Sequence, residues 1–372
     1  MSKEITVKHY KNKIFYNYNS NNNLLIKTKV NTNQSKAIIS PGFIDLQVNG
    51  NNGINFTSPD HINKKNVISI VDYHLKNGVF YFLPTITTNS NKNIKSSFSK
   101  LNKLRNLSKK IKKHIPCYHL EGPYISNEDG PRGAHQKKYI RNPSWEEFLG
   151  FQETAEGLIK IVTLAPELKG SIKFISKLRD NLIIPAIGHT NANTKQISES
   201  IEAGALLSTH IGNGAHEYIK RHPNYIWDQL SEDGLWSSLI ADGFHLSPNT
   251  LKVLIRAKGI KQCVLVSDAS YLRGMNAGNY TDFGKNILIE KNGKIKINNT
   301  NYLAGSNLNL IDGIFNTYNF SNVKLYQSIE MASFNPKKFL KKYANISLNI
   351  FDKNHYLIID PSKNSILHSI YL

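Results

Sequence analysis

The feature that most constrains the fold is a regular alternation of short apolar runs with longer segments of helical periodicity. Eight runs predict buried β-strands, at residues 41–50, 79–88, 115–124, 158–167, 182–190, 205–213, 237–245 and 262–270. Strands that alternate with helices form parallel sheets, and eight such units favour closure into a barrel. We therefore expect an α/β protein whose main domain, residues 41–339, is a TIM-like (β/α)8 barrel.

The segments between the runs carry helix signals at their ends. Pro59 after Ser58 predicts the start of a helix, because proline is favoured in the first helical turn. Ser144, three residues before Glu147, has the spacing of a capping box, and Ser247 precedes a proline as Ser58 does. These signals support helices that pack on the sheet.

The two ends of the chain have a different pattern. Residues 1–40 alternate short apolar runs with turns rich in asparagine and lysine, which is typical of β-strands. Strand-like runs return at residues 356–360 and 366–371. We expect residues 1–40 and 340–372 to pair with each other as a small β-sandwich domain that is discontinuous in sequence.

Composition bears mainly on location and partners. The net charge is +20, but the lysines are scattered and no nucleic-acid-binding motif is present, so we expect no nucleic-acid partner. Cys117 and Cys263 lie in apolar runs and are expected to be buried thiols of a reducing compartment. No apolar run approaches the roughly 17–25 residues that a membrane helix needs. The sequence thus predicts a cytoplasmic protein with no membrane contact.

Two histidines follow neighbouring runs at the points where the predicted strands end. His189 comes after the run at 182–187, and His210 comes after the run at 205–208. The carboxyl-terminal tips of barrel strands open into one mouth, so both imidazoles would lie within reach of one metal ion. Taken alone, either histidine would be read as an ordinary polar residue at a strand end.

Two carboxylates occupy corresponding places on other strands. Glu121 ends the third run before a Gly-Pro turn, and Asp268 ends the eighth. Glu121 completes, with His189 and His210, a set of three ligands that leaves one position open for water, as in catalytic sites. Asp268 would face the same mouth and could accept a proton from that water. Imidazole suits zinc and iron alike, so the ligands predict a divalent transition metal without naming it.

Several short motifs, taken with their order and spacing, resemble one known family. They are PGFIDLQVNG at 41–50, HLEGPY at 119–124, GAH at 133–135, GHT at 188–190, THIGN at 209–213, ADGFH at 241–245, SDA at 267–269 and LAGS at 303–306. From residue 41 to about residue 336 the chain is similar to the N-acetylglucosamine-6-phosphate deacetylases of the amidohydrolase superfamily. That family combines a barrel with a small β-sandwich from both termini, the organisation that the sequence pattern also predicts.

The resemblance implies a role for each matching residue. Glu121, His189 and His210 would bind the metal. Asp268 would act as general base and acid, and His135 would polarise the acetyl carbonyl. The residues that would contact the sugar phosphate are Ala134, His135, Asn213, Gly214, Arg221, His245, Leu303, Ala304 and Gly305. Arg221 and His245 match the pair that binds the phosphate, with part of that pair supplied by the partner subunit of a homodimer.

One difference from other amidohydrolases bears on the metal count. Two-metal members have His-x-His on the first strand, whereas this chain has Gln47 and Asn49, and neutral amides are poor ligands for a second transition metal. We expect one divalent zinc or iron ion per subunit. The expected reaction is metal-dependent removal of the acetyl group from N-acetylglucosamine 6-phosphate. Two alternatives stay open: the same chemistry on another N-acyl sugar or a cyclic amide, and a sugar-binding descendant without catalysis.

Overall fold

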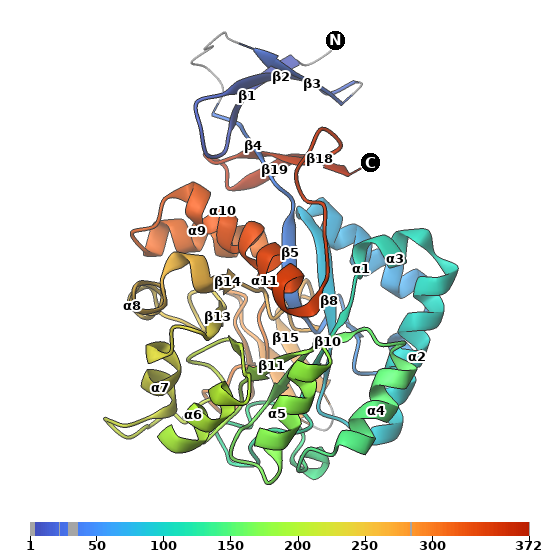
Figure 1. Ribbon diagram of the computed structural model, residues 1–372. Coiled ribbons are helices and arrows are strands. Elements are labelled where there is room, and N and C mark those ends of the chain that lie inside the picture. Colours follow the sequence, from blue (N-terminus) through green and yellow to red (C-terminus); the bar gives the residue numbers. More distant parts are fainter. Residues whose placement is uncertain (1–3, 22, 29–35, 283–284, 372) are drawn as a thin grey trace.

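A barrel of parallel strands forms the centre of the protein, as a computed structural model that describes residues 4–21, 23–28, 36–282 and 285–371 shows (Figure 1). The barrel strands in these ranges are β5 (Phe43–Val48), β8 (Val79–Thr87), β9 (Tyr118–Glu121), β10 (Ile159–Leu164), β11 (Ile184–Ile187), β12 (Leu207–Ser208), β13 (Trp236–Leu239) and β14 (Cys263–Leu265). They pair in the order β14-β13-β12-β11-β10-β9-β8-β5. Each lies within one of the eight predicted runs or, for β13, begins one residue before it, so the predicted α/β barrel is confirmed.

The seam between the first and last strands is closed at the mouth. Val48, at the end of β5, forms a parallel bridge with Ala269, beyond β14. The backbone N–H of Asn49 donates to the carbonyl of Ala269 at 3.0 Å. Because these contacts lie at or beyond the ends of the two strands, they join the segments that carry Asn49 and Asp268.

Helices surround the sheet in Figure 1. In the described ranges they are α1 (Lys64–Lys76), α2 (Asn91–Leu107), α3 (Lys109–His114), α4 (Trp145–Thr154), α5 (Ser171–Asp180), α6 (Thr194–Glu202), α7 (Tyr225–Ser231), α8 (Pro248–Lys258), α9 (Leu310–Phe320), α10 (Leu325–Met331) and α11 (Phe334–Ala344), with 3-10 turns at η1 (Pro59–His61), η2 (Lys137–Tyr139) and η3 (Ile260–Gln262). Helix α1 shows why they form, since its buried side chains recur at helical spacing and face the barrel.

The predicted helix starts were right at two places and wrong at one. Ser144 accepts a hydrogen bond from the backbone N–H of Glu147, and Ser247 caps α8 in the same way. Ser58 makes no capping hydrogen bond, and Pro59 opens only the 3-10 turn η1. The cap of α1 is Asn63, whose side chain accepts from the N–H of Asn66. Asparagine is as good a cap as serine, and this one directly precedes the apolar periodicity.

Strands from both ends of the chain form one sheet. In the described residues they are β1 (Glu4–His9), β2 (Phe15–Asn19), β3 (Leu24–Thr28), β4 (Ile38–Ser40), β18 (His355–Asp360) and β19 (Ser365–Tyr371), in the order β19-β18-β4-β1-β2-β3. The ring centroids of Tyr18 and Tyr356 are 6.4 Å apart although two strands lie between β2 and β18 in the sheet. The sheet therefore folds over on itself as two layers.

This β domain built from both termini confirms the second part of the predicted fold. Leu357 and Ile359 point into the barrel core, whereas Tyr356 and Ile358 fill a separate core within the domain. A Cβ atom on Gly78, which precedes β8, would lie 2.5 Å from Ile366, so the domain packs at the amino ends of the strands, opposite the mouth. The division of the chain at residues 40 and 340 stays a prediction, and residues 1–3, 22, 29–35 and 372 lie outside the described ranges.

A further small sheet was not predicted. Strands β15 (Gly278–Asp282), β16 (Lys285–Ile289) and β17 (Ile295–Ile297) pair antiparallel in the chain after β14. The backbone N–H of Ile297 donates to the carbonyl of Tyr302, and that of Ala304 donates to the carbonyl of Ile295. The small sheet thus holds residues 301–304 against the barrel mouth.

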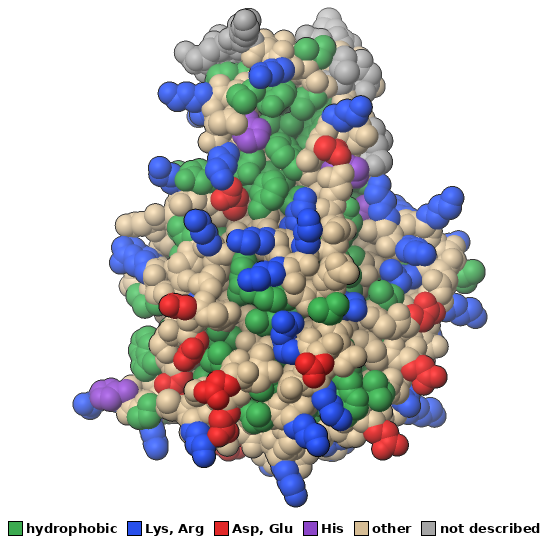
Figure 2. All heavy atoms as spheres, in the orientation of Figure 1, with side chains coloured by type: hydrophobic (Ala, Val, Ile, Leu, Met, Phe, Trp, Pro, Cys, Tyr) green, Lys and Arg blue, Asp and Glu red, His purple; other side chains and the backbone are tan. Residues whose placement is uncertain are grey.

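Charged side chains are spread over the surface. Figure 2 shows lysines and arginines distributed across the face in view, interleaved with uncharged and acidic groups rather than gathered along one groove. Within the described ranges, none of the helices combines the length and the apolar character needed to cross a bilayer.

Candidate active site

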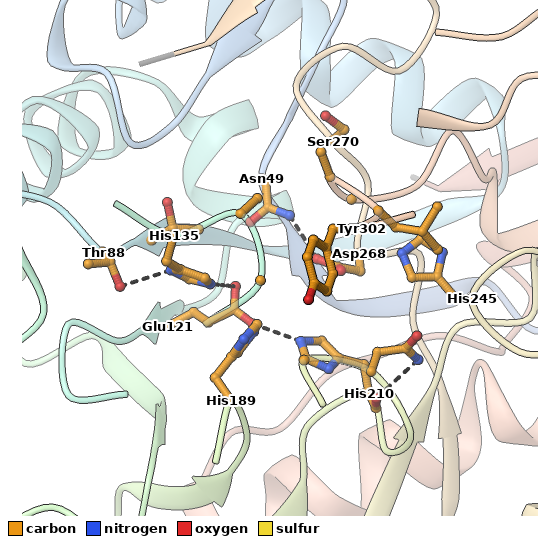
Figure 3. A pocket seen from close by; sticks show the side chains of 18 of the residues that line it. Asn49, Thr88, Glu121, His135, His189, His210, His245, Asp268, Ser270 and Tyr302 are labelled. Carbon is orange, nitrogen blue, oxygen red and sulfur yellow. Dashed lines mark hydrogen bonds and ion pairs between the residues drawn. The ribbon is translucent and has the colours of Figure 1, made fainter. Parts of the chain in front are cut away.

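A cavity of about 280 Å³ opens at the carboxyl ends of the barrel strands. Glu121 is the last residue of β9, and His189 and His210 each stand two residues beyond β11 and β12. Asp268 stands three residues beyond β14. His189, His210 and Asp268 have left-handed backbones, with φ of 53°, 30° and 46°. All four side chains line the cavity, and Figure 3 shows them converging from different strands.

Glu121, His189 and His210 form a group in the cavity that could hold a metal ion. Their ligand atoms all lie within 4.8 Å of one another, and among the described residues they are the one such group of three. Oε1 of Glu121 lies 3.2 Å from Nε2 of His189 and 3.0 Å from Nε2 of His210. Nδ1 of His189 lies 2.8 Å from the carbonyl of Pro131, which can only accept, so the proton is on Nδ1 and the Nε2 lone pair faces the cavity.

The electrostatics of this group also fit a cation. Burial would raise the pKa of Glu121, but its close contacts with the imidazoles of His189 and His210 outweigh that effect and hold the pKa well below the usual value. Burial would lower the pKa of His210, and the hydrogen bond with Glu121 reverses that effect and raises it. A buried, ionised carboxylate between two imidazoles supplies the charge and donor atoms that a divalent metal takes. The residues therefore suit a metal ion, whose identity they do not determine.

The two amides at the tip of β5 contact the carboxylates of the site. Nε2 of Gln47 donates to Oε1 of Glu121 at 2.8 Å, and Nδ2 of Asn49 donates to Oδ1 of Asp268 at 2.8 Å. Each amide thus directs its N–H group, rather than its carbonyl oxygen, towards the centre. Two-metal enzymes carry metal-binding histidines at these two positions. In this chain the amides at the same positions orient two carboxylates instead.

Asp268 and His135 lie on opposite sides of Glu121 (Figure 3). Burial, and then the charge of Glu121, raises the pKa of Asp268 to about 6. Burial, and then His189, lowers the pKa of His135 to about 3, so this imidazole is neutral. Nδ1 of His135 lies 2.8 Å from Oγ1 of Thr88, and its Nε2 lies 3.9 Å from Oε2 of Glu121. The His135 ring is therefore fixed with one nitrogen facing the cavity.

Most of the residues expected to contact a sugar phosphate lie in the same cavity. They are Ala134, His135, Asn213, Gly214, His245, Leu303, Ala304 and Gly305. Nζ of Lys285 donates to the carbonyl of Ala134 at 2.8 Å and holds the loop that carries His135. Nδ1 of His245 lies 2.6 Å from Oδ2 of Asp242, and this bond outweighs burial to lower the pKa of Asp242.

Gly214 illustrates how closely the backbone approaches the centre. Its φ is 57°, and a Cβ atom there would lie 2.6 Å from Nδ1 of His189. Any larger residue would displace either the imidazole or the loop. Glycine at this position therefore fits the observed packing on His189.

Arg221 is the one predicted site residue that this chain does not bring to the cavity in the described structure. It is exposed in the long loop between β12 and α7, and it does not line the cavity. Its neighbours in this region include exposed apolar side chains, with Tyr218 at 88% and Trp227 at 51% exposure. Within a single chain, Arg221 therefore makes no contribution to the cavity.

Some residues that line the cavity were not predicted. They are Asn55, Thr87, Thr88, Gly130, Gly133, Gln136, Gly212, Ala215, His216, Ser270, Tyr271, Asn301 and Tyr302, besides Asn49. Thr88 could have been found, because it ends a predicted strand and so belongs at the mouth. Tyr302 carries no local signal, since its position depends on the small sheet that was not predicted.

The amino-acid sequence is similar to those of known amidohydrolases. The sequence model of the Amidohydrolase family matches residues 38–348. An N-acetylglucosamine-6-phosphate deacetylase of Bacillus subtilis (strain 168) is 30% identical over 336 residues, covering 90% of this chain and 81% of that protein. An N-acetylgalactosamine-6-phosphate deacetylase of Escherichia coli O157:H7 is 26% identical over 316 residues, covering 83% and 80%.

The fold has close structural relatives as well. A variant of N-acetyl-D-glucosamine-6-phosphate deacetylase from Mycobacterium smegmatis, solved in complex with N-acetyl-D-glucosamine-6-phosphate, has a TM-score of 0.83 at 21% identity, covering 98% of this chain and 96% of that chain. The N-acetylglucosamine-6-phosphate deacetylase of Thermotoga maritima has a TM-score of 0.79 at 22% identity, covering 98% and 93%. At this level of identity the likeness establishes the shared fold.

Proposed function

This chain belongs to the amidohydrolase family and, within it, to the N-acetylglucosamine-6-phosphate deacetylases, and on that premise we propose that it hydrolyses N-acetylglucosamine 6-phosphate to glucosamine 6-phosphate and acetate. The observation that carries the proposal is the grouping of Glu121, His189 and His210 with Asp268 in one cavity. A sugar-binding descendant without catalysis would have no need to retain a buried proton acceptor beside a metal-binding group.

The residues of the cavity divide the work of amide hydrolysis. A divalent zinc or iron ion, held by Glu121, His189 and His210, would supply an acidic water and draw electron density from the acetyl carbonyl. Asp268 accepts a proton from the attacking water and returns it to the departing amine. Neutral His135 donates a hydrogen bond from Nε2 to the acetyl oxygen as negative charge develops on it, while Thr88 donates to Nδ1.

The proposal includes one metal ion per subunit. The amides of Gln47 and Asn49 direct their N–H groups to Glu121 and Asp268, and neutral amides are poor ligands for a second transition metal. Three protein ligands and one water complete a single tetrahedral site.

We place the phosphate of the substrate near His245, with Arg221 of a partner subunit as its second contact. His245 lines the cavity, whereas Arg221 is exposed in a loop that also carries the exposed Tyr218, and Trp227 follows close in sequence. Exposed aromatic and apolar side chains around a long loop favour a protein interface, which supports a homodimer. The free, buried thiols of Cys117 and Cys263 and an anionic substrate favour the cytoplasm.

Acetate release from a panel of amides tests the proposed function. N-acetylglucosamine 6-phosphate should be hydrolysed faster than plain N-acetylglucosamine, and a cyclic amide should not react. The galactose epimer belongs in the panel, because one relative is an N-acetylgalactosamine-6-phosphate deacetylase. If metal-loaded protein bound the phosphorylated sugar but released no acetate, the sugar-binding alternative would replace the enzyme.

Replacing Arg221 with alanine should lower kcat/KM for the phosphorylated sugar by about 10- to 150-fold, mainly through KM. A hydrogen bond to a charged group is worth about 1.5–3 kcal/mol, and each 1.36 kcal/mol is about a factor of ten. The phosphate contact is the same in ground and transition states, so kcat should change little. The unphosphorylated sugar should be affected much less.

Lys220→Ala is the matched control, because Lys220 is an exposed cation next to Arg221 in the same loop. It should leave KM nearly unchanged. Equal losses on phosphorylated and plain sugar in the Arg221 variant would remove Arg221 from the phosphate site without affecting the deacetylase proposal.

A further inference from the structure

Arg273 is a buried arginine, five residues beyond Asp268, to which the proposed reaction assigns no part. Only 2% of it is exposed. Its Nε donates to Oδ1 of Asn51 at 2.9 Å, Nη1 donates to the carbonyl of Leu308 at 3.3 Å, and Nη2 lies 3.1 Å from Nε2 of His74. Each of these partners is an uncharged acceptor. Burying a charged guanidinium among uncharged partners lowers the stability of the fold. The presence of Arg273 here therefore calls for an explanation.

His74 is built to accept from this arginine. Its Nδ1 lies 2.8 Å from the carbonyl of Ile70, which can only accept a hydrogen bond. The proton of the neutral imidazole is therefore on Nδ1, and Nε2 presents a lone pair to Arg273. The ring stacks on Phe82 with centroids 4.2 Å apart, so it cannot turn away easily. Burial, and then the charge of Arg273, keeps the pKa of His74 well below its usual value.

The other two acceptors belong to segments that carry parts of the active site. Asn51 follows Asn49, whose side chain donates to Asp268. Leu308 follows residues 303–305, which line the cavity. Arg273 itself lies on the segment that begins at Asp268. One guanidinium therefore connects, through Asn51 and Leu308, the segments bearing the proton acceptor, its amide partner and the substrate loop.

Backbone hydrogen bonds join the same three segments nearer the cavity. The N–H of Ser306 donates to the carbonyl of Asp268 at 2.9 Å, and the N–H of Ser270 donates to the carbonyl of Ser306 at 2.9 Å. The N–H of Asn52 donates to the carbonyl of Arg273 at 2.8 Å. These bonds tie the segments together as a unit, and the side chain of Arg273 adds a further connection to Asn51 and Leu308.

The guanidinium lies over the ring of Tyr73, 4.9 Å from its centroid, and a buried carboxylate also compensates part of its charge. Asp45 is fully buried on β5, and the charge of Arg273 is among the influences that lower its pKa, although burial raises that pKa to about 6 overall. Oδ1 of Asp45 accepts from the backbone N–H of Ser267 at 3.1 Å, directly before Asp268. Asp45 therefore holds the chain directly before Asp268, and Arg273 holds the chain after it.

We propose that Arg273 is a positioning residue that sets the orientation of Asp268 and Asn49 towards the substrate, and thereby sets kcat. The inference rests on the proposed deacetylase function. A planar guanidinium can donate in three fixed directions at once, which neither lysine nor a neutral side chain can do. Catalytic groups displaced by about 1 Å lose roughly 100-fold in rate, so small movements of this unit matter.

Two substitutions at Arg273 test the proposal against a control elsewhere in the barrel. Arg273→Met should lower kcat by about 10- to 100-fold with little change in KM. The kcat of Arg273→Lys should lie between that of Arg273→Met and that of the wild type. The amount of bound metal per chain should stay unchanged in both variants. The control is Arg105→Met, because Arg105 is also buried, at 7% exposure, and its Nε donates to the carbonyl of Ile115. It should lose thermal stability but keep kcat.

Combination with Asp268→Asn separates positioning from general stability. If Arg273 acts through Asp268, Arg273→Met should cost almost nothing further in the Asp268→Asn background, whereas a structural loss would be additive. If Arg273→Met does not fold, Asn51→Ala, which removes only the Nε contact, takes its place with the same expectations. The inference would be overturned, and the proposed function would stand, if the wild type is active and Arg273→Met has normal kcat. Additive losses in the double variant would have the same consequence. A wild-type protein that releases no acetate would overturn the proposed function and this inference with it.

Discussion

Asp268→Asn should lower the turnover of N-acetylglucosamine 6-phosphate by at least about 100- to 10,000-fold, the usual contribution of general acid–base catalysis. Asparagine has nearly the same volume and can still accept the hydrogen bond that Asn49 now donates to Oδ1 at 2.8 Å. It cannot accept a proton from water or return one to the amine. The loss should therefore appear in kcat, with bound metal and melting temperature close to those of the wild type.

Glu167→Gln is a suitable control for this experiment. Glu167 is another partly buried carboxylate at the same end of the barrel, where it accepts from Thr190 and from the backbone of Asn191, but it does not line the cavity. Its conversion to an amide should leave turnover nearly unchanged. Near-normal turnover in Asp268→Asn would exclude Asp268 as the group that transfers the proton.

His210→Ala should abolish most of the bound metal, and with it more than about 100-fold of the activity. Purified wild-type protein should contain one transition metal ion per chain by elemental analysis. Loss of a residue that merely supports a metal ligand typically lowers metal affinity or activity about 10- to 100-fold. Loss of one of the three protein ligands, which leaves only Glu121 and His189, should lower metal affinity by more than that. Chelation of wild-type protein should give the same loss, and added zinc or iron should reverse it.

The control is His114→Gln. His114 is a buried histidine, 3% exposed, whose Nδ1 lies 2.7 Å from the carbonyl of Phe80 on the outside of the barrel. This variant should keep one metal per chain even if its stability falls. Two tightly held ions in active wild-type protein would contradict the role assigned to Gln47 and Asn49 as donors to the two carboxylates.

The sequence was sufficient for the barrel because its strands are short apolar runs that end in polar residues. The grouping of Glu121, His189 and His210 follows from that pattern, since the tips of parallel strands meet at one end of a barrel. Helix boundaries were less certain where two caps compete, as at Ser58 and Asn63. The apolar periodicity that begins directly after Asn63 decided between them, because the two residues are equally good caps and a proline signal alone could not place the helix.

The small sheet and the residues it supports could not be placed from strand–helix alternation, because its strands interrupt that alternation after the last barrel strand. The apolar spacing of Ile287 and Ile289, followed by the Asn292-Gly293 turn, is the local signal that indicates a hairpin there. Tyr302 depends on that sheet for its position at the mouth. Arg221 is a different case, because the contact that we propose for it involves a partner subunit, about which a single sequence gives only the motif.

The left-handed backbones of His189, His210 and Asp268 have a consequence for engineering this protein. Such a conformation costs a non-glycine residue roughly 1–2 kcal/mol, and glycine adopts it freely. Natural or laboratory selection for heat resistance alone would therefore favour glycine at the three positions where the proposed chemistry needs imidazole or carboxylate. Libraries of this chain should be screened for acetate release and thermal survival together, since survival alone would enrich well-folded proteins with an empty active centre.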